Sequence, residues 1–205
     1  MFGGMFDPVH AGHLAAARYA RDALGLDTVL LVPCKRPNHR DGAFASGEQR
    51  LEMLELACAG EASLEASPIE LQRDSVSYSV DTLAQLRAES PGSLFVFLLG
   101  LDAFASLTAW ERWRELLDDN LLAVFSRPGA TLEPEVEESL ELAARRADTP
   151  EALFCATRGR VILLDKIDHA LSSTAVRKAL ASGGVAEAGL TQEVSDYICR
   201  HGLYA

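Results

Sequence analysis

Short apolar runs alternate with amphipathic stretches along most of this chain. Four runs, at residues 28–33, 93–100, 121–128 and 160–165, are almost continuously apolar. A strand with one wet face would alternate apolar and polar side chains, so continuous runs predict strands that are buried on both faces. Such strands are typical of a parallel sheet that is covered by helices on both faces.

The stretches between these runs have helical periodicity. They are residues 14–25, 47–60, 78–90, 110–119 and 133–149. Strands that alternate with helices predict an α/β fold, a doubly wound, Rossmann-like parallel sheet. The length suits one domain, and we expect a single domain over residues 1–205 because no linker, repeat or low-complexity tract interrupts it.

The two ends of the chain complete the predicted elements. Met1 and Phe2 should form the first strand, which would be unusually short and points to a late start site or a trimmed chain. Residues 191–205 predict a last helix, with Thr191 as its N-cap and Gly202 just past its end.

Composition and charge exclude several classes of protein. The chain has 19 Lys and Arg against 30 Asp and Glu, a net charge of -11, which gives no general attraction to nucleic acid or an acidic membrane. Apolar runs stay well short of the roughly 20 residues that span a bilayer. Because no pair of the four cysteines has C-x-x-C spacing, we expect free, reduced, mostly buried thiols in a cytoplasmic protein.

Unusual polar residues follow the ends of the predicted strands. They occur at residues 3–14, 34–40, 100–104 and 168–178. Ligands of open α/β sheets bind outside the carboxyl ends of the strands, so these segments predict one site. In so acidic a protein, an anionic ligand needs cations gathered locally.

His10 and His13 are the first candidates in this site. They lie at the expected first turn of a helix, where positions i and i+3 share a face. A helix start suits phosphate, and imidazoles there can donate to phosphate oxygens. One capping and one core histidine, or a metal site, are the alternatives. Helical zinc motifs space their histidines i, i+4, so the i, i+3 spacing here disfavours a metal site. The Gly-Gly bend at a strand end, directly before this pair, favours phosphate.

Two further segments carry cations. Four potential cations follow the second strand within six residues, namely Lys35, Arg36, His39 and Arg40. Residues 172–178 predict a helix start with hydroxyl caps and Arg177 one turn in. A solvated loop and a plain cap are the alternatives for the two segments. Together with the histidines, they suggest a ligand with several phosphates.

These motifs resemble those of a known superfamily. GGMFDPVHAGHL together with SSTAVR resembles the nucleotidyltransferases, which carry H-x-G-H near the start and an I-S-S-T-x-x-R-like motif near the end. Within it, SYSVDTL, FLLGLDAFASLTAWERWRELLD and YICRHGLY are similar to bacterial nicotinate-nucleotide adenylyltransferases over essentially the whole chain. Met5 stands where the family has Thr or Ser, Asn38 replaces a proline, and Leu171 replaces Ile.

The resemblance implies a reaction and roles for named residues. ATP and nicotinate mononucleotide would give nicotinate adenine dinucleotide and pyrophosphate, by in-line attack on the α-phosphorus. His10 and His13 would be catalytic. The implied ATP-binding residues are Gly4, Phe6, Gly100, Asp102, Ser173, Thr174 and Arg177. The implied mononucleotide-binding residues are Lys35, His39, Arg40, Tyr78, Ser79 and Trp110. Mg²⁺ would be carried by the ATP phosphates, without a metal site in the protein.

Three alternatives stay open at this point. A related adenylyltransferase could act on nicotinamide mononucleotide or phosphopantetheine. A nucleotide-binding regulatory module with an inactive site is a different class. A dehydrogenase is disfavoured, because no G-x-G-x-x-G follows a strand. The sequence predicts no particular oligomeric state.

Overall fold

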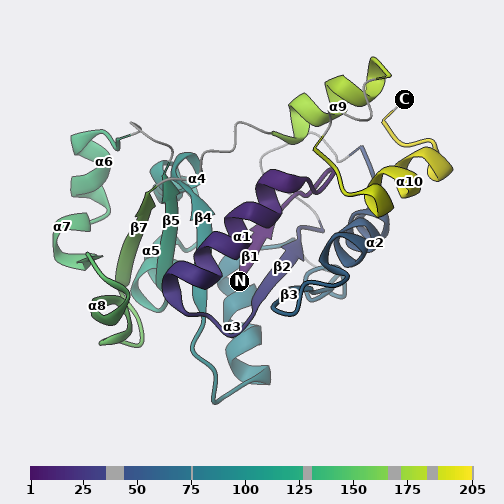
Figure 1. The fold of residues 1–205 in the computed structure, drawn as a ribbon. Helices are drawn as coiled ribbons and strands as arrows, with labels where there is room; N and C mark the ends of the chain where they lie inside the picture. The colour runs from purple at the N-terminus through teal and green to yellow at the C-terminus, as the bar shows by residue number, and fades with distance from the viewer. Residues whose placement is uncertain (36–43, 75, 127–130, 166–171, 184–188, 205) are drawn as a thin grey trace. The chain divides into compact units, whose positions relative to one another are not determined.

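The strands form a parallel sheet. The computed structural model describes residues 1–35, 44–74, 76–126, 131–165, 172–183 and 189–204. Within these residues the sheet has seven strands in the order β3-β2-β1-β4-β5-β7-β6 (Figure 1). The strands are β1 (Phe2–Gly4), β2 (Val29–Pro33), β3 (Leu64–Ala66), β4 (Val96–Gly100), β5 (Leu121–Ser126), β6 (Arg146–Ala147) and β7 (Arg160–Asp165). The predicted Rossmann-like α/β fold is confirmed.

Helices connect most of the strands. They are α1 (Ala11–Leu24), α2 (Gly47–Cys58), α3 (Ser79–Glu89), α4 (Leu101–Ala105), α5 (Trp113–Asp118), α6 (Pro134–Ser139), α7 (Leu142–Arg145), α8 (Pro150–Phe154), α9 (Ser173–Ala181) and α10 (Gln192–His201), with a 3₁₀ turn η1 (Leu107–Ala109). The crossovers between parallel strands run through such helices, as the alternating pattern of the sequence predicts.

The chain divides into two compact units, each assembled from several stretches of sequence. Unit 1 comprises Met1–Phe2, Asp22–Gly25 and Tyr78–Asp168, and unit 2 comprises Gly3–Arg21, Leu26–Ser77 and His169–Ala205. The chain passes between the units several times, so neither is a simple N- or C-terminal half. The expectation of a single domain over residues 1–205 stays a prediction.

The centre of unit 1 is the ladder of β4, β5 and β7. β4 pairs with β5 from Val96 opposite Leu121 to Gly100 opposite Phe125, and β5 pairs with β7 along all six residues. Every residue of β5 is buried. For β5 this confirms a strand without a wet face. The run expected from residue 93 becomes a strand only at Val96, and Leu94 before it is exposed.

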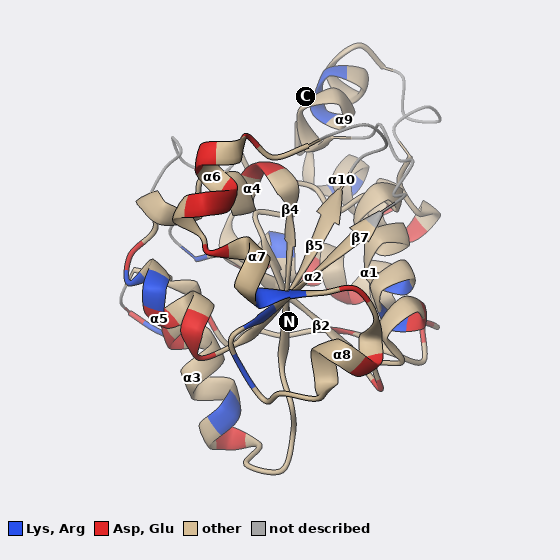
Figure 2. Cartoon of the chain, turned by 90° about the vertical axis from the view of Figure 1, so that its left-hand side faces the viewer, with Lys and Arg blue, Asp and Glu red and all other residues tan. Residues whose placement is uncertain are grey.

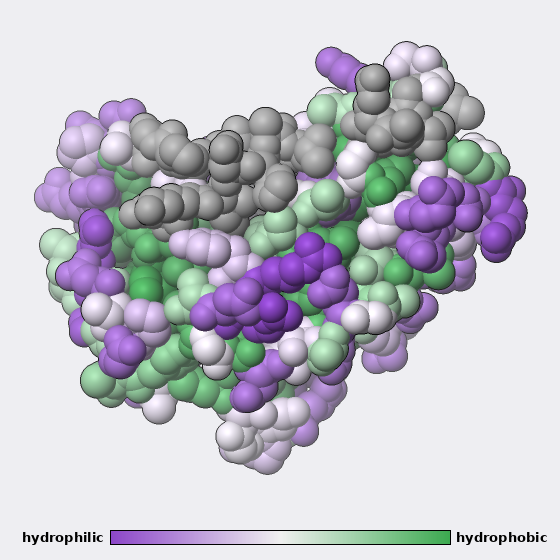
Figure 3. Space-filling model, viewed as in Figure 1, coloured by the Kyte–Doolittle hydropathy of each residue, from purple (hydrophilic) through white to green (hydrophobic). Residues whose placement is uncertain are grey.

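Unit 2 packs its last helix on α2. The predicted caps of α10 are confirmed: Thr191 Oγ1 accepts from Val194 N at 3.4 Å, and Gly202 ends the helix in the left-handed region at φ 60°. Hydrophilic side chains cover the outer face of α10 (Figure 3), while Val194 and Ile198 are buried. Helix α9 likewise begins after the predicted N-cap, Ser172.

Several element boundaries differ from the prediction. The helix expected at 110–119 begins only at Trp113, because Arg112 has a left-handed φ of 52°. Residues 133–149 form two short helices and β6, since Glu141 at φ 51° interrupts the helical backbone. The sequence did not predict β3 or β6, which are too short to produce an apolar run.

The thiols and the helices bear on two further expectations. All four cysteines are free, as predicted. Cys58 is buried and Cys34 half-buried, but Cys155 and Cys199 are exposed, so the expectation of mostly buried thiols is wrong for that pair. Cys199 lies on the wet face of α10, and Cys155 caps α8 at its C-terminal end. In the part of the chain that the structure describes, no helix is long and apolar enough to cross a membrane.

Candidate active site

The loop after β1 differs from the predicted Gly-Gly bend. Gly4 still belongs to β1, and its carbonyl accepts from Cys34 N at 2.9 Å. The chain turns instead at Phe6, which is buried and has a left-handed φ of 48°. A Cβ on Gly4 would lie 3.2 Å from the Phe6 ring. The glycine therefore makes room for this ring, and the ATP-binding roles of Gly4 and Phe6 stay predictions.

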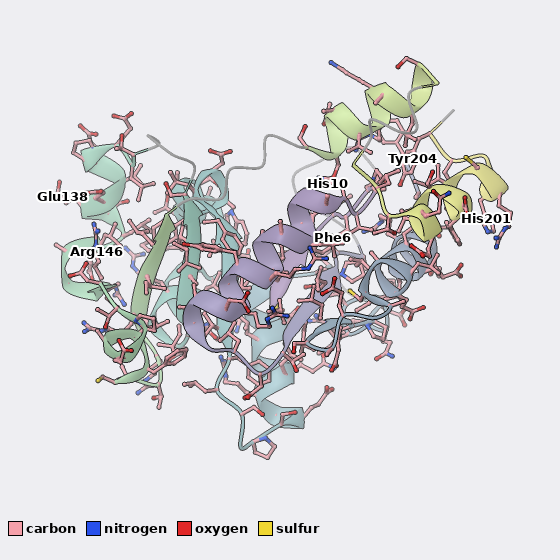
Figure 4. All side chains as sticks on the ribbon, viewed as in Figure 1. Phe6, His10, Glu138, Arg146, His201 and Tyr204 are labelled. Atoms are coloured by element: carbon pink, nitrogen blue, oxygen red, sulfur yellow. The ribbon has the colours of Figure 1, made fainter. Side chains whose placement is uncertain are left out.

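The two histidines come together at the start of α1. His10 directly precedes the helix and His13 lies in its first turn, where His13 N donates to His10 O at 2.9 Å. Their rings stack with centroids 3.8 Å apart. The rings of Phe6 and His13 meet edge-on, with centroids 4.9 Å apart. Figure 4 shows Phe6 and His10 at this end of the helix. The predicted shared face is confirmed.

Hydrogen bonding and burial set the protonation of His13. The backbone N–H of His10 donates to Nδ1 of His13 at 3.3 Å, so Nδ1 carries the lone pair and Nε2 the proton. Burial, and after it the charge of His10, lowers the pKa of His13 to about 3. At neutral pH His13 is thus an uncharged donor through Nε2.

The start of α9 is fixed to the same loop. Ser173 Oγ donates to the carbonyl of Pro8 at 3.1 Å, and Arg177 Nη1 donates to the carbonyl of Asp7 at 2.6 Å. Arg177 Nη2 also lies 3.3 Å from Thr174 Oγ1. Unit 2 therefore brings the H-x-G-H segment and the S-S-T-x-x-R-like segment to one place, as the sequence predicts.

Asp7 is a structural centre that the sequence analysis missed. It is buried, and its carboxylate accepts from Phe44 N at 2.8 Å, from Ala45 N at 3.1 Å and from the Tyr204 hydroxyl at 2.6 Å. The Arg177 guanidinium lies over the Phe44 ring, 4.5 Å from its centroid. An Asp-Pro dipeptide predicts only a local turn, whereas the partners of this carboxylate are distant in sequence.

Arg50 is the second missed residue. It is fully buried in α2, and its guanidinium donates to the carbonyls of Met5 at 2.7 Å, Cys34 at 2.6 Å and Ala45 at 3.4 Å. Burial lowers the pKa of Arg50, and the nearby carboxylate of Asp7 opposes this shift. One side chain thereby ties together the segments that follow β1 and β2.

The predicted cation loop is only partly described. Lys35 Nζ donates to Arg73 O at 2.5 Å and lies 3.4 Å from a carboxylate oxygen of Asp74. His39 and Arg40 lie outside the described residues. Lys35 thus contacts residues 73–74. The role of Lys35 in binding the mononucleotide stays a prediction.

Unit 1 carries Gly100 and Asp102 at the carboxyl end of β4. Gly100 is the N-cap of α4, and Asp102 lies in the first turn of that helix with an exposed side chain. A Cβ on Gly100 would meet nothing within 4 Å. The backbone is therefore open to close approach, which is compatible with the predicted contact to a nucleotide ribose.

The serines of SYSVDTL are natural N-caps and predict unpaired N–H donors near Ser79 at a helix start, and the structure corrects one detail of this prediction. Ser79 is the first residue of the helix rather than its N-cap, and the N-cap, Tyr78, makes no side-chain capping bond. The N–H groups of Asp81 and Thr82 donate to Tyr78 O. Within the described part of the chain, the N–H groups of Ser79 and Val80 have no hydrogen-bond partner. A free pair of donors therefore lies where the sequence analysis expects it.

Trp110 lies between η1 and α5, not at the opening of a helix as expected. Its backbone is extended, and its ring meets Phe97 of β4 edge-on with centroids 6.4 Å apart. Of the two tryptophans in TAWERW, the sequence favours Trp113, which lies further into the expected helix, as the core residue. Trp113 is only half-buried, and the Arg114 guanidinium lies 4.3 Å from the centroid of its ring.

An acidic hollow in unit 1 does not suit a polyphosphate. Figure 2 marks acidic residues on α6, whose six residues include three glutamates. The hollow is lined by Glu137, Glu138, Glu141, Leu142 and Arg146, among others, and Figure 4 labels Glu138 and Arg146. Like charges repel, so phosphates favour the cationic side chains of unit 2.

Comparison with known proteins places this arrangement in a class of nucleotidyltransferases. A family model described as cytidylyltransferase-like matches residues 1–179. The nicotinic acid mononucleotide adenylyltransferase of Plasmodium falciparum, solved in complex with NaAD, matches with a TM-score of 0.76 at 16% identity. The match covers 99% of this chain and 95% of that one. At this identity, the likeness concerns the fold.

Sequence relatives identify the family. A probable nicotinate-nucleotide adenylyltransferase of Aeromonas hydrophila is 41% identical, and the alignment covers all of this chain and 95% of the relative. A protein of the same description from Pseudomonas fluorescens is 42% identical over all of this chain and 95% of its own length. The chain belongs to the nicotinate-nucleotide adenylyltransferase family.

Proposed function

We propose that this protein transfers the adenylyl group of ATP to nicotinate mononucleotide, releasing pyrophosphate and forming nicotinate adenine dinucleotide for NAD biosynthesis. The mononucleotide phosphate attacks the α-phosphorus of ATP in line, and pyrophosphate leaves. Such a reaction needs positioning and charge stabilisation rather than a covalent intermediate. The observation that carries the proposal is the attachment of the Arg177 helix to the loop of His10 and His13.

This loop supplies the proposed ATP phosphate site. His13 presents Nε2–H as a neutral donor, and His10 stacks on it. Ser173, Thr174 and Arg177 add two hydroxyls and a guanidinium at the start of α9. A guanidinium is suited to phosphate because its planar donors match the phosphate oxygens. Gly4 and Phe6 support the loop from within.

The remaining ATP-binding residues, Gly100 and Asp102, and the proposed mononucleotide-binding residues lie elsewhere in the chain. Gly100 and Asp102 would contact a nucleotide ribose. Trp110 would stack on the pyridine ring, and Tyr78 and Ser79 would face its carboxylate through the free N–H groups at the start of α3. Lys35, His39 and Arg40 would hold the mononucleotide phosphate.

Nucleotide triphosphates react as complexes with a divalent metal, and we assign Mg²⁺. Among the described residues, no group of three His, Cys, Asp or Glu side chains could hold a metal ion. The triphosphate would carry the ion, which neutralises charge on the phosphates. A cytoplasmic location, which suits the free thiols, is part of the same proposal.

The test supplies ATP and Mg²⁺ with one acceptor at a time: nicotinate mononucleotide, nicotinamide mononucleotide or phosphopantetheine. Pyrophosphate release is measured, with H13A as the inactive control, because a positioned donor contributes roughly 10²–10³ in rate. We expect nicotinate mononucleotide to be preferred. If pyrophosphate release is faster with another acceptor, the proposal is rejected in favour of a related transferase. If no acceptor gives pyrophosphate release, it is rejected in favour of a regulatory module.

The preference for acid over amide can be assigned to the start of α3. A carboxylate accepts from both free N–H groups, and hydrogen bonds to charged groups contribute about 1.5–3 kcal/mol each. The amide would partly replace these bonds with weaker neutral ones, which leaves a preference of about 2–4 kcal/mol. We therefore expect kcat/KM to favour the acid by roughly 30- to 1000-fold. Ser79→Pro removes one N–H at the first helical position, where proline fits, and should lose much of the preference. Ser79→Ala keeps the N–H and should retain it.

A further inference from the structure

The C-terminal end of unit 2 reaches back to the loop after β1. Beyond Gly202, which ends α10, the hydroxyl of Tyr204 donates to Oδ1 of Asp7 at 2.6 Å. Tyr204 adopts a left-handed φ of 62°, which a bulky residue enters only when its surroundings hold it there. The fold therefore holds the phenol on Asp7 against the preference of its own backbone.

Asp7 joins Tyr204 to Arg177. The carbonyl of Asp7 accepts from Arg177 Nη1 at 2.6 Å, and its carboxylate accepts from Phe44 N at 2.8 Å. The Phe44 ring in turn lies under the Arg177 guanidinium at 4.5 Å, and the Tyr204 ring lies beside Phe44, with centroids 6.5 Å apart. We call these three residues, Asp7, Phe44 and Tyr204, the Arg177 support. The guanidinium is held by the carbonyl of Asp7 and by the aromatic face of Phe44.

We propose that Tyr204 is a positioning residue that fixes Arg177 for the phosphates of ATP by way of Asp7 and Phe44. The proposal rests on the ATP-binding role of Arg177 given above. Arginine has a long side chain that loses rotamer freedom when it binds a ligand, so a support that orders it beforehand improves affinity. Burial, and then the hydrogen bond to Asp7, raises the pKa of Tyr204, so its hydroxyl remains a donor at neutral pH.

The first test is Tyr204→Phe, which removes only the oxygen. We expect KM for ATP to rise about three- to tenfold, with kcat and KM for the mononucleotide changing by less than about twofold. Tyr197→Phe is the matched control, because Tyr197 lies in α10 and contacts His201 rather than the Arg177 support. It should leave KM for ATP unchanged. Phe44→Leu, which removes the ring under the guanidinium, should act as Tyr204→Phe does.

A double-mutant cycle separates positioning from a general structural role. In an Arg177→Met background, Tyr204→Phe should no longer change KM for ATP, since the group it positions is absent. If Arg177→Met raises KM for ATP and Tyr204→Phe has no effect alone, or the same effect in both backgrounds, the positioning role is overturned and the proposed function stands. If Arg177→Met leaves KM for ATP unchanged, the ATP-binding role of Arg177 is rejected, and the positioning role with it.

Discussion

The buried guanidinium of Arg50 gives the sharpest prediction for stability. Its two short hydrogen bonds, to the carbonyls of Met5 and Cys34, hold together the segments that follow β1 and β2. The third, to Ala45 at 3.4 Å, is at the limit of a hydrogen bond and contributes little. Arg50→Met keeps an unbranched apolar stem of similar length but leaves both carbonyls without this donor.

The magnitude follows from those two carbonyls. Leaving a fully buried acceptor unsatisfied costs about 1–3 kcal/mol, so for these two part-buried carbonyls roughly 2–6 kcal/mol is the upper bound. Removal of a buried charge that burial itself disfavours offsets part of this cost. We expect Arg50→Met to lower the free energy of unfolding by about 3 kcal/mol. Arg50→Lys should cost about half as much, because one ammonium has no fork to span both carbonyls.

The assay is urea unfolding followed by far-UV circular dichroism. Both tryptophans belong to unit 1, while Arg50 belongs to unit 2, so tryptophan fluorescence would report on the wrong unit. The control is Arg18→Met, which removes a partly exposed ion pair with Glu61 and should cost no more than about 1 kcal/mol. If Arg50→Met costs no more than this control, the reasoning from the two carbonyls is refuted.

Two further predictions concern His13 and Trp110. The pKa of His13 is about 3 in the folded chain and 6.5 for a free imidazole, so the unfolded chain binds the proton more tightly and stability falls as pH drops below 6.5. Between pH 6.5 and 5 this should remove about 1–2 kcal/mol relative to His13→Gln, and equal pH slopes of the two unfolding curves would contradict it. Trp110→Ala should weaken mononucleotide binding by about 1–3 kcal/mol, and ATP binding less. Trp113→Ala is the control, and equal losses for both ligands in calorimetry would make Trp110 structural.

Local features of the site could be predicted from the sequence, because their physics is local. The pairing of His10 with His13 follows from the helical repeat, and the caps Ser172 and Thr191 follow from the chemistry of hydroxyl side chains at helix starts. The continuous apolar run of β5 likewise predicts burial on both faces from its own residues alone. Each of these inferences needs only a few neighbouring residues.

The supports of the site could not be predicted, because their partners are distant in sequence. The carboxylate of Asp7 bonds to residues 44, 45 and 204, and nothing near residue 7 signals them. Arg50 does leave a signal: it lies three, four and seven positions before the buried Met53, Leu54 and Ala57. A cation on the apolar stripe of a helix predicts a buried hydrogen-bond network, although the sequence does not name its acceptors.

The turns at Phe6, Arg112 and Glu141 were missed for a different reason. Each has a left-handed φ, near 50°, without being glycine. This conformation is expected at glycine or asparagine, so the sequence does not predict it where the residue is bulky. In two of the three cases, the missed residue is also where a predicted helix fails to begin or to continue.

Two exposed thiols allow spectroscopic labels to be attached to this chain. Cys155 belongs to unit 1 and Cys199 to unit 2, and both are exposed. Burial raises the pKa of Cys58 to about 11, which leaves it almost entirely as the unreactive thiol at neutral pH. With Cys34 replaced by serine, a donor and an acceptor dye would therefore attach one to each unit. Energy transfer between them would then follow the separation of the two units as ATP and the mononucleotide are added.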